Sequence, residues 1–258
     1  MVQSVQRAVR ILRELMGAEL RLGVTQLSER IGVAKPTVHA LLRTLESESL
    51  VVQDAESGKY QLGPALVTLG NAYLDTHELR TRAATWANLL VTRTGEAVWV
   101  GVLVEEEVLV VHHAFRPESI VQVLETGATL PWGASALGKA IAAFSPAERR
   151  RQLLKGPLVA LTGRTVTDPA ELAAQLDEVR NTGYAVEAQE LTLGDAGIAA
   201  PVIDRTGVAV GAVGLVGPVE RLLCDERRQD FAIATRETAR NLSSELGAFR
   251  GGGRPAML

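Results

Sequence analysis

The sequence is poor in the residues that build covalent or metal-bound frameworks. Cysteine occurs once in 258 residues, as Cys224, and the four histidines do not stand at metal-ligand spacing. One cysteine can form neither an intrachain disulfide nor a cysteine zinc site, so we expect no metal and no cofactor. This composition is typical of a protein that stays in the reducing cytoplasm.

Long hydrophobic runs are also missing. No apolar segment approaches the ~20 residues of a membrane span, so we expect a cytoplasmic protein without a membrane partner. The N-terminus interleaves Arg7, Arg10 and Arg13 with apolar residues and therefore lacks the apolar centre of a signal peptide. With 47% hydrophobic and 22% charged residues, the composition is that of a globular protein that can bury a core without cross-links.

Positively charged residues are fewer than negatively charged ones. The net charge is −3, which taken as an average argues against a nucleic-acid partner. Residues 1–62 contain 8 Lys/Arg and 7 Asp/Glu, or +1, whereas the remainder contains 19 and 23, or −4. Any DNA binding must therefore come from the position of the cations and not from their number.

The first part of the chain shows helical periodicity. Apolar residues recur at helical spacing over 4–16, with Ser4 as the expected N-cap, and Thr25 is the expected cap of a second helix that Gly32 ends. A third helix has Pro36 in its first turn, where the missing N–H costs nothing. This third helix is expected to pack through Val38, Leu41, Leu42 and Leu45.

Two short β-prone runs, LVVQD and KYQLG, follow around a polar tip and predict a hairpin. Three helices and a hairpin in this order are typical of a winged helix-turn-helix. Later strands alternate with helices, which predicts a two-domain α+β protein whose second domain has a mainly antiparallel sheet flanked by helices. The predicted parts are a winged helix-turn-helix at 1–63, a linker helix at 64–76, the second domain at 77–250 and a flexible tail at 251–258.

The third helix carries a polar surface on the side that its leucines do not use. Lys35 and Arg43, with neighbouring hydroxyls, an imidazole and the small Ala40, suit phosphates and base edges in a major groove. A solvated face is the alternative for this helix alone, but the preceding helix, the tight turn and the hairpin favour DNA binding. The start of the second helix can hold a phosphate, and the hairpin tip can reach the adjacent backbone. The candidate DNA-binding residues are Thr25, Lys35, Pro36, Thr37, His39, Ala40, Arg43, Thr44 and Lys59.

A single such domain should bind DNA weakly. It carries only about +1, and affinity at physiological salt comes largely from displaced counterions. Two linked domains on half-sites one helical turn apart remove this limit. We therefore predict a dimer that binds pseudo-palindromic operators.

Six separated blocks, in order over nearly the whole chain, resemble the IclR-type transcriptional regulators. They are SVQRAVRILREL, QLSERIGVAKPTVHALLRTLE, GKYQLGPALVTLG, TGATLPWGASALGKAIAAF, TDPAELAAQLDEVRNTGYAVEAQE and GIAAPVIDRTG. The resemblance implies an N-terminal winged helix for operator DNA, a linker helix, and a C-terminal effector domain related to the GAF and profilin-like folds. It also implies dimers that often pair into tetramers.

In the family, a small effector binds between the sheet, the loop that here reads PWGASALGK and the strand that here reads YAVEAQE. Glu187 stands where the family commonly has Asp, and Trp132 replaces a frequent His, which should reshape the mouth of the pocket. Carried over residue by residue, the effector-binding positions are Ser135, Ala136, Leu137, Gly138, Glu187, Gly197, Gly214 and Val216. The last three stand where some carboxylate-binding members have Cys or Ser, so a small carboxylate would lose hydrogen-bond donors here.

These departures favour a neutral polyol as the effector. A buried Glu187 carboxylate would repel an anion but accept hydrogen bonds from hydroxyl groups. Two further blocks, LGNAYLDTHELRTRA and VHHAFRPESIVQVLETGA, resemble a branch of the family that controls glycerol operons in actinomycetes. Glycerol is therefore the expected effector; glycerol 3-phosphate would need a cation, for which Arg116 or Lys139 are the candidates. The alternative for Glu187 is a surface carboxylate at a sheet edge.

One rival hypothesis is a nucleotide hydrolase, because GASALGKA at 133–140 has the frame of a phosphate-binding loop. Ala140 occupies the place of the Mg²⁺-binding hydroxyl, and no convincing buried strand precedes the segment. We expect Lys139 to contact protein instead. His112 and His113 adjoin on a strand and point to opposite faces, so they share no metal or catalytic proton.

Together these features predict a regulator and not an enzyme. We expect a repressor of a small-metabolite catabolic operon, with glycerol as the candidate metabolite. Effector binding should move the second domains relative to one another, and the linker helix should then change the spacing of the two recognition helices.

Overall fold

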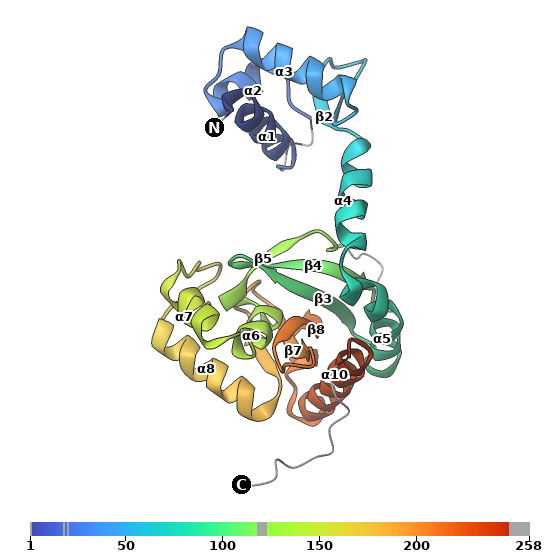
Figure 1. Ribbon diagram of the computed structural model, residues 1–258, viewed down its shortest axis with the longest axis vertical. Coiled ribbons are helices and arrows are strands. Elements are labelled where there is room, and N and C mark those ends of the chain that lie inside the picture. Colours follow the sequence, from blue (N-terminus) through green and yellow to red (C-terminus); the bar gives the residue numbers. More distant parts are fainter. Residues whose placement is uncertain (1, 18, 20, 118–122, 248–258) are drawn as a thin grey trace. The chain divides into compact units, whose positions relative to one another are not determined.

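The computed structural model of the protein describes residues 2–17, 19, 21–117 and 123–247, and the chain forms two compact units that divide between Thr76 and His77 (Figure 1). The expected tail at 251–258 lies outside the described residues. A helix-turn-helix unit followed by a unit with an antiparallel sheet confirms the predicted α+β fold class. In the described ranges, no helix is long and apolar enough to cross a membrane.

The first unit is a three-helix core closed by a hairpin. It consists of α1 (Gln3–Leu15), α2 (Val24–Ile31), α3 (Lys35–Ser47), β1 (Val51–Gln53) and β2 (Tyr60–Leu62), and the two strands pair antiparallel. Apolar side chains from all of these elements meet in one cluster, whose burial is the main term that stabilises the unit. The buried members are Ile11, Leu15, Leu22, Leu27, Ile31, Val38, Leu42, Leu45, Val51 and Tyr60.

The turn between α2 and α3 has the predicted backbone. Gly32 adopts a φ of 68°, in the left-handed region that glycine enters without a steric cost. The hydroxyl of Ser28 donates to the carbonyl of Val33 at 2.6 Å, and the Val33 amide donates back to the Ser28 carbonyl at 3.2 Å. Pro36 lies in the first turn of α3, also as predicted. These contacts set the angle at which α3 leaves α2.

The two predicted N-caps in this unit were wrong. Ser4 lies inside α1, which begins at Gln3, and Thr25 lies inside α2, whose N-cap is Gly23. The amide of Gly23 donates to the carboxamide oxygen of Gln26 at 3.0 Å. At this helix start a long side chain reaches back from the first turn and accepts from the N-cap amide, and no capping hydroxyl is used.

The second unit is built on a six-stranded antiparallel sheet with the order β5-β4-β3-β8-β7-β6. The short edge strand β5 was not predicted, because three residues carry no visible alternation. The strands are β3 (Ala97–Val104), β4 (Glu107–Ala114), β5 (Thr129–Pro131), β6 (Ala185–Ala188), β7 (Asp195–Ile203) and β8 (Ala209–Pro218).

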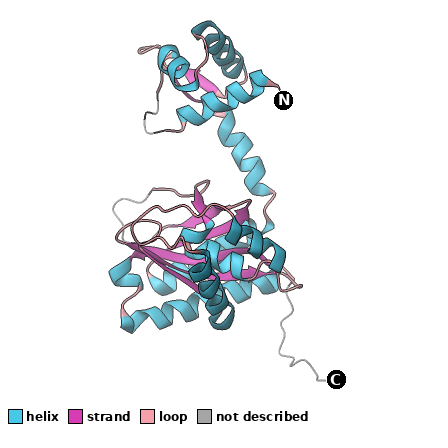
Figure 2. Ribbon diagram, turned by 90° about the vertical axis from the view of Figure 1, so that its left-hand side faces the viewer, coloured by secondary structure: helices cyan, strands magenta, loops and turns pink. Residues whose placement is uncertain are grey.

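Helices cover both faces of this sheet (Figure 2). A Cβ added to Gly211 would lie 2.3 Å from Leu79 of α5, whereas one added to Gly101 would meet Leu137 of α6. Gly101 pairs with Ala212, so Gly211 faces the other side and the two helices lie on opposite faces. The elements are α5 (Glu78–Thr94), η1 (Trp132–Ala134), α6 (Ala136–Ala143), α7 (Ala147–Lys155), α8 (Pro169–Thr182), α9 (Val219–Leu222) and α10 (Asp225–Glu245).

The ends of α8 carry the chemical signals that are typical of helix boundaries. The carboxylate of Asp168 accepts from the amide of Ala170 at 2.8 Å, and Gly183 ends the helix with a φ of 79°. Helix α8 supplies Leu172, Leu176 and Val179 to the core beneath α6. The strand β6 then begins two residues after Gly183, so this helix end sets where the sheet edge starts.

Candidate functional site

The exposed side of α3 is the first candidate surface. Val38, Leu42 and Leu45 are buried, while Leu41 is only half-buried, so the helix is fixed by one stripe and its other side is free. Thr37 is half-buried at the edge of that stripe. The exposed candidates on α3 are Lys35, Pro36, His39, Ala40, Arg43 and Thr44.

Two candidates belong to other elements of the same unit. Thr25 is exposed in the first turn of α2, and Lys59 is exposed next to β2. The hydroxyl of Thr44 donates to its own helix, at 3.2 Å from the Ala40 carbonyl, so it offers acceptor capacity to a partner. The structure thus presents seven candidates along α3 and two on flanking elements.

A small cavity in the second unit lies between the start of α6 and one face of the sheet. The strand register places its lining in two neighbouring rows. Glu187 pairs with Gly197, which pairs with Val216, and in the next row Trp99 pairs with Gly214, which pairs with Ala199. The lining residues are Trp99, Leu130, Ser135, Ala136, Leu137, Glu187, Leu191, Gly197, Ala199, Gly214, Leu215 and Val216.

Two glycines help to make this hollow. A Cβ on Gly197 would lie 3.2 Å from the Cβ of Ala136 and 3.4 Å from the Cγ of Glu187. A Cβ on Gly214 would lie 2.7 Å from the Cβ of Ala199. Any larger side chain at these positions would fill the space between the sheet and α6. The two residues therefore leave room next to Glu187.

Glu187 is the acidic group of the cavity. Its side chain is 4% exposed, and one carboxyl oxygen accepts from the backbone amide of Glu190 at 3.0 Å. Burial raises the pKa of Glu187 to about 7, and the nearby Glu190 adds to this rise, although backbone amides of Glu190 and Leu191 oppose it. Near neutral pH the group therefore exchanges between an acceptor-only carboxylate and a carboxylic acid that can also donate.

The start of α6 faces Glu187 across the cavity. The hydroxyl of Ser135 accepts from the amide of Gly138 at 3.1 Å and so caps the helix. Ala136 and Leu137 follow in the first turn, where amides have no partner within the helix. A hydroxyl group between these elements would meet donors on one side and an acceptor on the other.

A buried ion pair connects α6 to the segment that follows β6. The ammonium of Lys139 lies 2.5 Å from a carboxylate oxygen of Glu190, and the two side chains are 1% and 8% exposed. The second Glu190 oxygen accepts from the amide of Val166 at 3.4 Å. The pair joins α6 to the segment after β6 and thereby holds the backbone amide that bonds Glu187.

The cavity is small and lacks positive charge. About 20 Å³ of it admits the centre of a water molecule, which is room for about one water. Of the lining residues that the structure describes, none is Lys, Arg or His. Lys139 is engaged by Glu190, and Arg116 lies outside the lining. The geometry therefore suits a small neutral group better than a phosphate, and the walls must part to admit one.

Seven of the eight residues carried over from the resemblance line this cavity, and Gly138 is the exception. A Cβ on Gly138 would lie 2.2 Å from the carbonyl oxygen of Trp132, so this glycine permits close packing behind the wall. Trp132, which the sequence led us to expect near the mouth of the pocket, is not among the lining residues, and its side chain is 2% exposed in the main core. The sequence reasoning missed five lining residues: Trp99, Leu130, Leu191, Ala199 and Leu215. The alternation of AVWVGVLV marks a strand but does not show which face Trp99 shares with Glu187.

The phosphate-loop frame at 133–140 does not form a nucleotide site. It runs through a 3-10 turn into α6 after the edge strand β5, and Ala140 is fully buried. Lys139 contacts Glu190, as the sequence led us to expect. Within the described residues, no group of three or more His, Cys, Asp or Glu side chains could hold a metal ion.

Comparisons with known proteins match the two parts of the chain to two separate domain families. Residues 4–55 match the profile of the IclR helix-turn-helix domain, and residues 71–244 match that of the bacterial transcriptional regulator IclR C-terminal domain. The glycerol operon regulatory protein of Streptomyces griseus is 47% identical over 250 residues, covering 96% of this chain and 98% of that protein. Its counterpart in Streptomyces coelicolor is 46% identical with the same coverage.

A solved structure shows the same fold. The crystal structure of an IclR transcriptional regulator from Alicyclobacillus acidocaldarius superposes with a TM-score of 0.81 at 28% identity, covering 96% of this chain and all of that one.

Proposed function

This chain belongs to the IclR family of bacterial transcriptional regulators, which are DNA-binding proteins and not enzymes, and from this premise we propose that it represses a glycerol catabolic operon in response to a polyol effector. Two supports are independent of one another. The Streptomyces relatives carry the name of glycerol operon regulatory proteins. Among the described residues that line the cavity, Glu187 supplies an acidic group and none is a cation, which is the observation that carries the proposal.

The DNA-binding surface is proposed to be the exposed side of α3. Lys35 at its first turn suits a phosphate, and Arg43, two turns further along, suits a phosphate or a guanine edge. Thr25 and Lys59 would add backbone contacts from the flanking elements. Because the first part of the chain carries only about +1, we propose that two copies bind a pseudo-palindromic operator together.

The effector is proposed to bind between the start of α6 and Glu187. A hydroxyl group both donates and accepts, so it can use the Glu187 carboxyl on one side and the first amides of α6 on the other. Glycerol offers three such groups without charge. An anionic ligand would instead face a buried carboxyl with no cation in the described lining, so glycerol 3-phosphate is the weaker candidate.

Binding requires the cavity to open, which gives a route to regulation. The cavity has space for about one water molecule and must expand to admit glycerol. Leu191 lines the cavity from the segment after β6, and the Lys139–Glu190 ion pair holds this segment in place. Glycerol would stabilise the open arrangement only by its difference in affinity for the two arrangements. A coupling of ~1 to 3 kcal/mol would change operator affinity by roughly 5 to 150 fold.

The test is a thermal-shift titration of the purified chain with glycerol, glycerol 3-phosphate and pyruvate. Glycerol should raise the melting temperature of the wild type, because it binds the native state, and should not do so in Glu187→Gln. A general co-solvent effect of glycerol would persist in Glu187→Gln, and Glu178→Gln, at an exposed carboxylate on α8, is the matched substitution control and should respond as the wild type does. A shift with pyruvate but none with glycerol would reject the polyol assignment. Loss of the glycerol response in both variants would reject the role of Glu187.

A further inference from the structure

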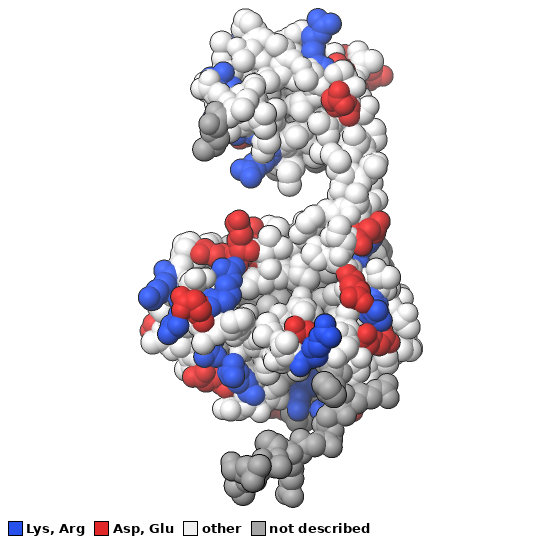
Figure 3. Space-filling model, in the orientation of Figure 1, with Lys and Arg blue, Asp and Glu red and all other residues white. Residues whose placement is uncertain are grey.

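Most cations of the first unit have no acidic partner inside it. The unit contains eight Lys and Arg, of which its last helix, α4 (Ala65–Asp75), supplies none. Arg21 pairs with Asp54 at 3.1 Å, and Arg30 pairs with Glu19 at 3.0 Å. On the visible face of this unit, Figure 3 shows Asp and Glu side chains on the side of the hairpin, and Lys and Arg side chains also on the opposite side. Within the described residues, the cations without an ion pair are Arg7, Arg10, Arg13, Lys35, Arg43 and Lys59.

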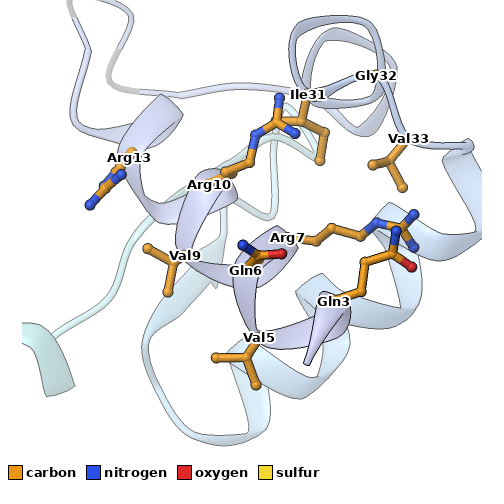
Figure 4. Close-up of a pocket in the computed structure, with 10 residues that line it drawn as sticks. All are labelled: Gln3, Val5, Gln6, Arg7, Val9, Arg10, Arg13, Ile31, Gly32 and Val33. Carbon is orange, nitrogen blue, oxygen red and sulfur yellow. The ribbon is translucent and has the colours of Figure 1, made fainter. Parts of the chain in front are cut away.

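Two of these cations meet in a groove between α1 and the turn that leads into α3 (Figure 4). The groove has a volume of about 580 Å³, and none of the described residues that line it is Asp or Glu. In Figure 4, Arg7 and Arg10 extend toward the turn, whereas Arg13 points away from it. The wall that α1 contributes is therefore cationic, and no acidic side chain of the described lining offsets it.

The pair of arginines needs an explanation, because its repulsion is not compensated inside the unit. Arg7 and Arg10 are three residues apart on α1, and like charges at this spacing destabilise a helix. Arg7 is also half-buried, which adds a cost for a cation that has no acidic partner. Both costs disappear if a partner from outside the chain brings negative charge into the groove.

The groove adjoins the end of α3 that the proposed DNA surface uses. Gly32 and Val33 form its second wall, and Lys35 follows two residues later as the first residue of α3. The N-cap residue Ala34 makes no side-chain cap hydrogen bond, so this helix end presents N–H groups and a partial positive charge to an anion. A row of phosphates that lies against the start of α3 therefore continues into the groove.

The chemistry of the groove favours phosphate among the possible anions. A guanidinium donates two parallel N–H bonds to a phosphate, and two guanidinium groups one helical turn apart can hold neighbouring phosphates of one strand. Gln3 lines the same wall and is of a side-chain type that also contacts the DNA backbone. An acidic protein segment would have to compete with the DNA that α3 is proposed to bind. The continuity with α3 therefore favours the DNA backbone as the partner.

We propose that this groove binds the phosphate backbone that flanks the bases facing α3, with Arg7 and Arg10 as the contacts. The inference rests on the proposed function, because α3 must lie on the same DNA. It adds two cations to Lys35, Arg43 and Lys59 in each copy. Since phosphates carry no sequence information, these contacts should strengthen binding to all sequences alike. The unpaired cations of the first unit, and not the net charge of −3, then decide the affinity for DNA.

The salt dependence of DNA binding tests the contact. The full wild-type chain selects its operator from a random-sequence pool, and fluorescence anisotropy then gives the association constant from about 50 to 200 mM salt. Arg7→Gln or Arg10→Gln should each reduce the slope of its logarithm against the logarithm of salt concentration by about 0.9, or about 1.8 when two copies bind. Arg7→Lys and Arg10→Lys keep the charge and should keep the wild-type slope. Arg205→Gln removes an exposed cation of the second unit and should leave the slope unchanged.

Ethylation of single phosphates locates the contact on the DNA. In the wild type, ethylated phosphates flanking each half-site should block binding. Arg7→Gln and Arg10→Gln should become insensitive to ethylation at these phosphates and stay sensitive at those nearer the bases that α3 faces. Their relative affinities for operators with single base changes should remain those of the wild type.

Each contrary result has a distinct meaning. Wild-type slopes and ethylation patterns in both Gln variants would overturn the proposal while leaving the α3 surface in place. Altered base preference would overturn it as well, because it would show base contacts. Unchanged slopes with weaker self-association by light scattering would show that the groove faces a second copy. If Arg7→Gln fails to fold, the exposed Arg10 decides the outcome alone. A wild-type chain that selects no DNA would reject the proposed function itself.

Discussion

Replacing Glu187 by Gln should make the second unit more stable at high pH and change little at low pH. In the unfolded chain this carboxyl titrates near 4.5, and in the folded chain its pKa is raised to about 7 by burial. The folded state therefore holds its proton more tightly than the unfolded state. Stability is highest below the unfolded pKa, falls as pH rises from 4.5 to 7, and stays reduced above 7.

The size of the effect follows from the pKa difference. A rise from 4.5 to about 7 corresponds to about 3 kcal/mol of stability lost between full protonation and full ionisation. Gln keeps a side-chain oxygen that can accept from the Glu190 amide, but it does not titrate. The stability of Glu187→Gln relative to wild type should therefore rise by roughly 2 to 3 kcal/mol between pH 5 and pH 8. Any constant cost of the substitution cancels in this difference.

Urea unfolding followed by tryptophan fluorescence measures this difference. The three tryptophans, Trp86, Trp99 and Trp132, all lie in the second unit, so the signal reports the unit that contains Glu187. Unfolding curves at pH 5, 6, 7 and 8 for wild type, Glu187→Gln and the exposed control Glu178→Gln give the three profiles. If the wild-type and Glu187→Gln profiles run parallel over this range, Glu187 is not a carboxyl with a raised pKa and the description of the cavity is wrong.

Three further changes test other parts of the structure. Lys139→Met should lower the free energy of unfolding in urea by about 3 to 5 kcal/mol, because it leaves Glu190 buried without its cation. Adding Glu190→Gln should recover much of this loss, and a double variant without recovery would contradict the ion pair. Gly138→Ala should lower the free energy of unfolding by more than about 3 kcal/mol, because the added Cβ would overlap the Trp132 carbonyl. The control Gly163→Ala, whose Cβ would meet no atom within 4 Å, should change it by no more than about 0.5 kcal/mol. Arg43→Ala should weaken operator binding in gel shifts by ~1 to 3 kcal/mol if the side chain contacts a base, while the free energy of unfolding stays unchanged. Unaltered gel shifts would show that Arg43 is not part of the interface.

Local rules predicted the elements whose ends carry a strong chemical signal. Gly32 and Pro36 predicted the end of α2 and the start of α3, because each acts on backbone groups within one turn of itself. The same rules describe Asp168 and Gly183 at the two ends of α8. The same reasoning failed at Ser4, where a hydroxyl suggested a cap that the chain does not use. Several neighbouring residues can serve as the N-cap of one helix, and a short stretch of sequence does not show which of them takes that position.

The cavity shows the other limit of sequence reasoning. Its residues were found through a resemblance to a family and not through their spacing, since Ser135, Glu187 and Gly214 are far apart in the chain. The strand register then explains why they meet, because Glu187, Gly197 and Val216 form one row across three strands. Trp99 joins the neighbouring row only because β3 pairs with β8, more than 100 residues later.

By itself the sequence determined the kind of protein: helices with their apolar stripes, a hairpin, a cation-bearing third helix and the blocks that mark a regulator. These are properties of short windows, in which periods of 3.6 and 2 residues decide what is buried. The tertiary structure alone decided that Glu187 is buried against α6 with Glu190 and Lys139 behind it, and that Arg7 and Arg10 share a groove with the turn that precedes α3. Both depend on which distant segments pack together, and the free energy of that packing belongs to no single segment.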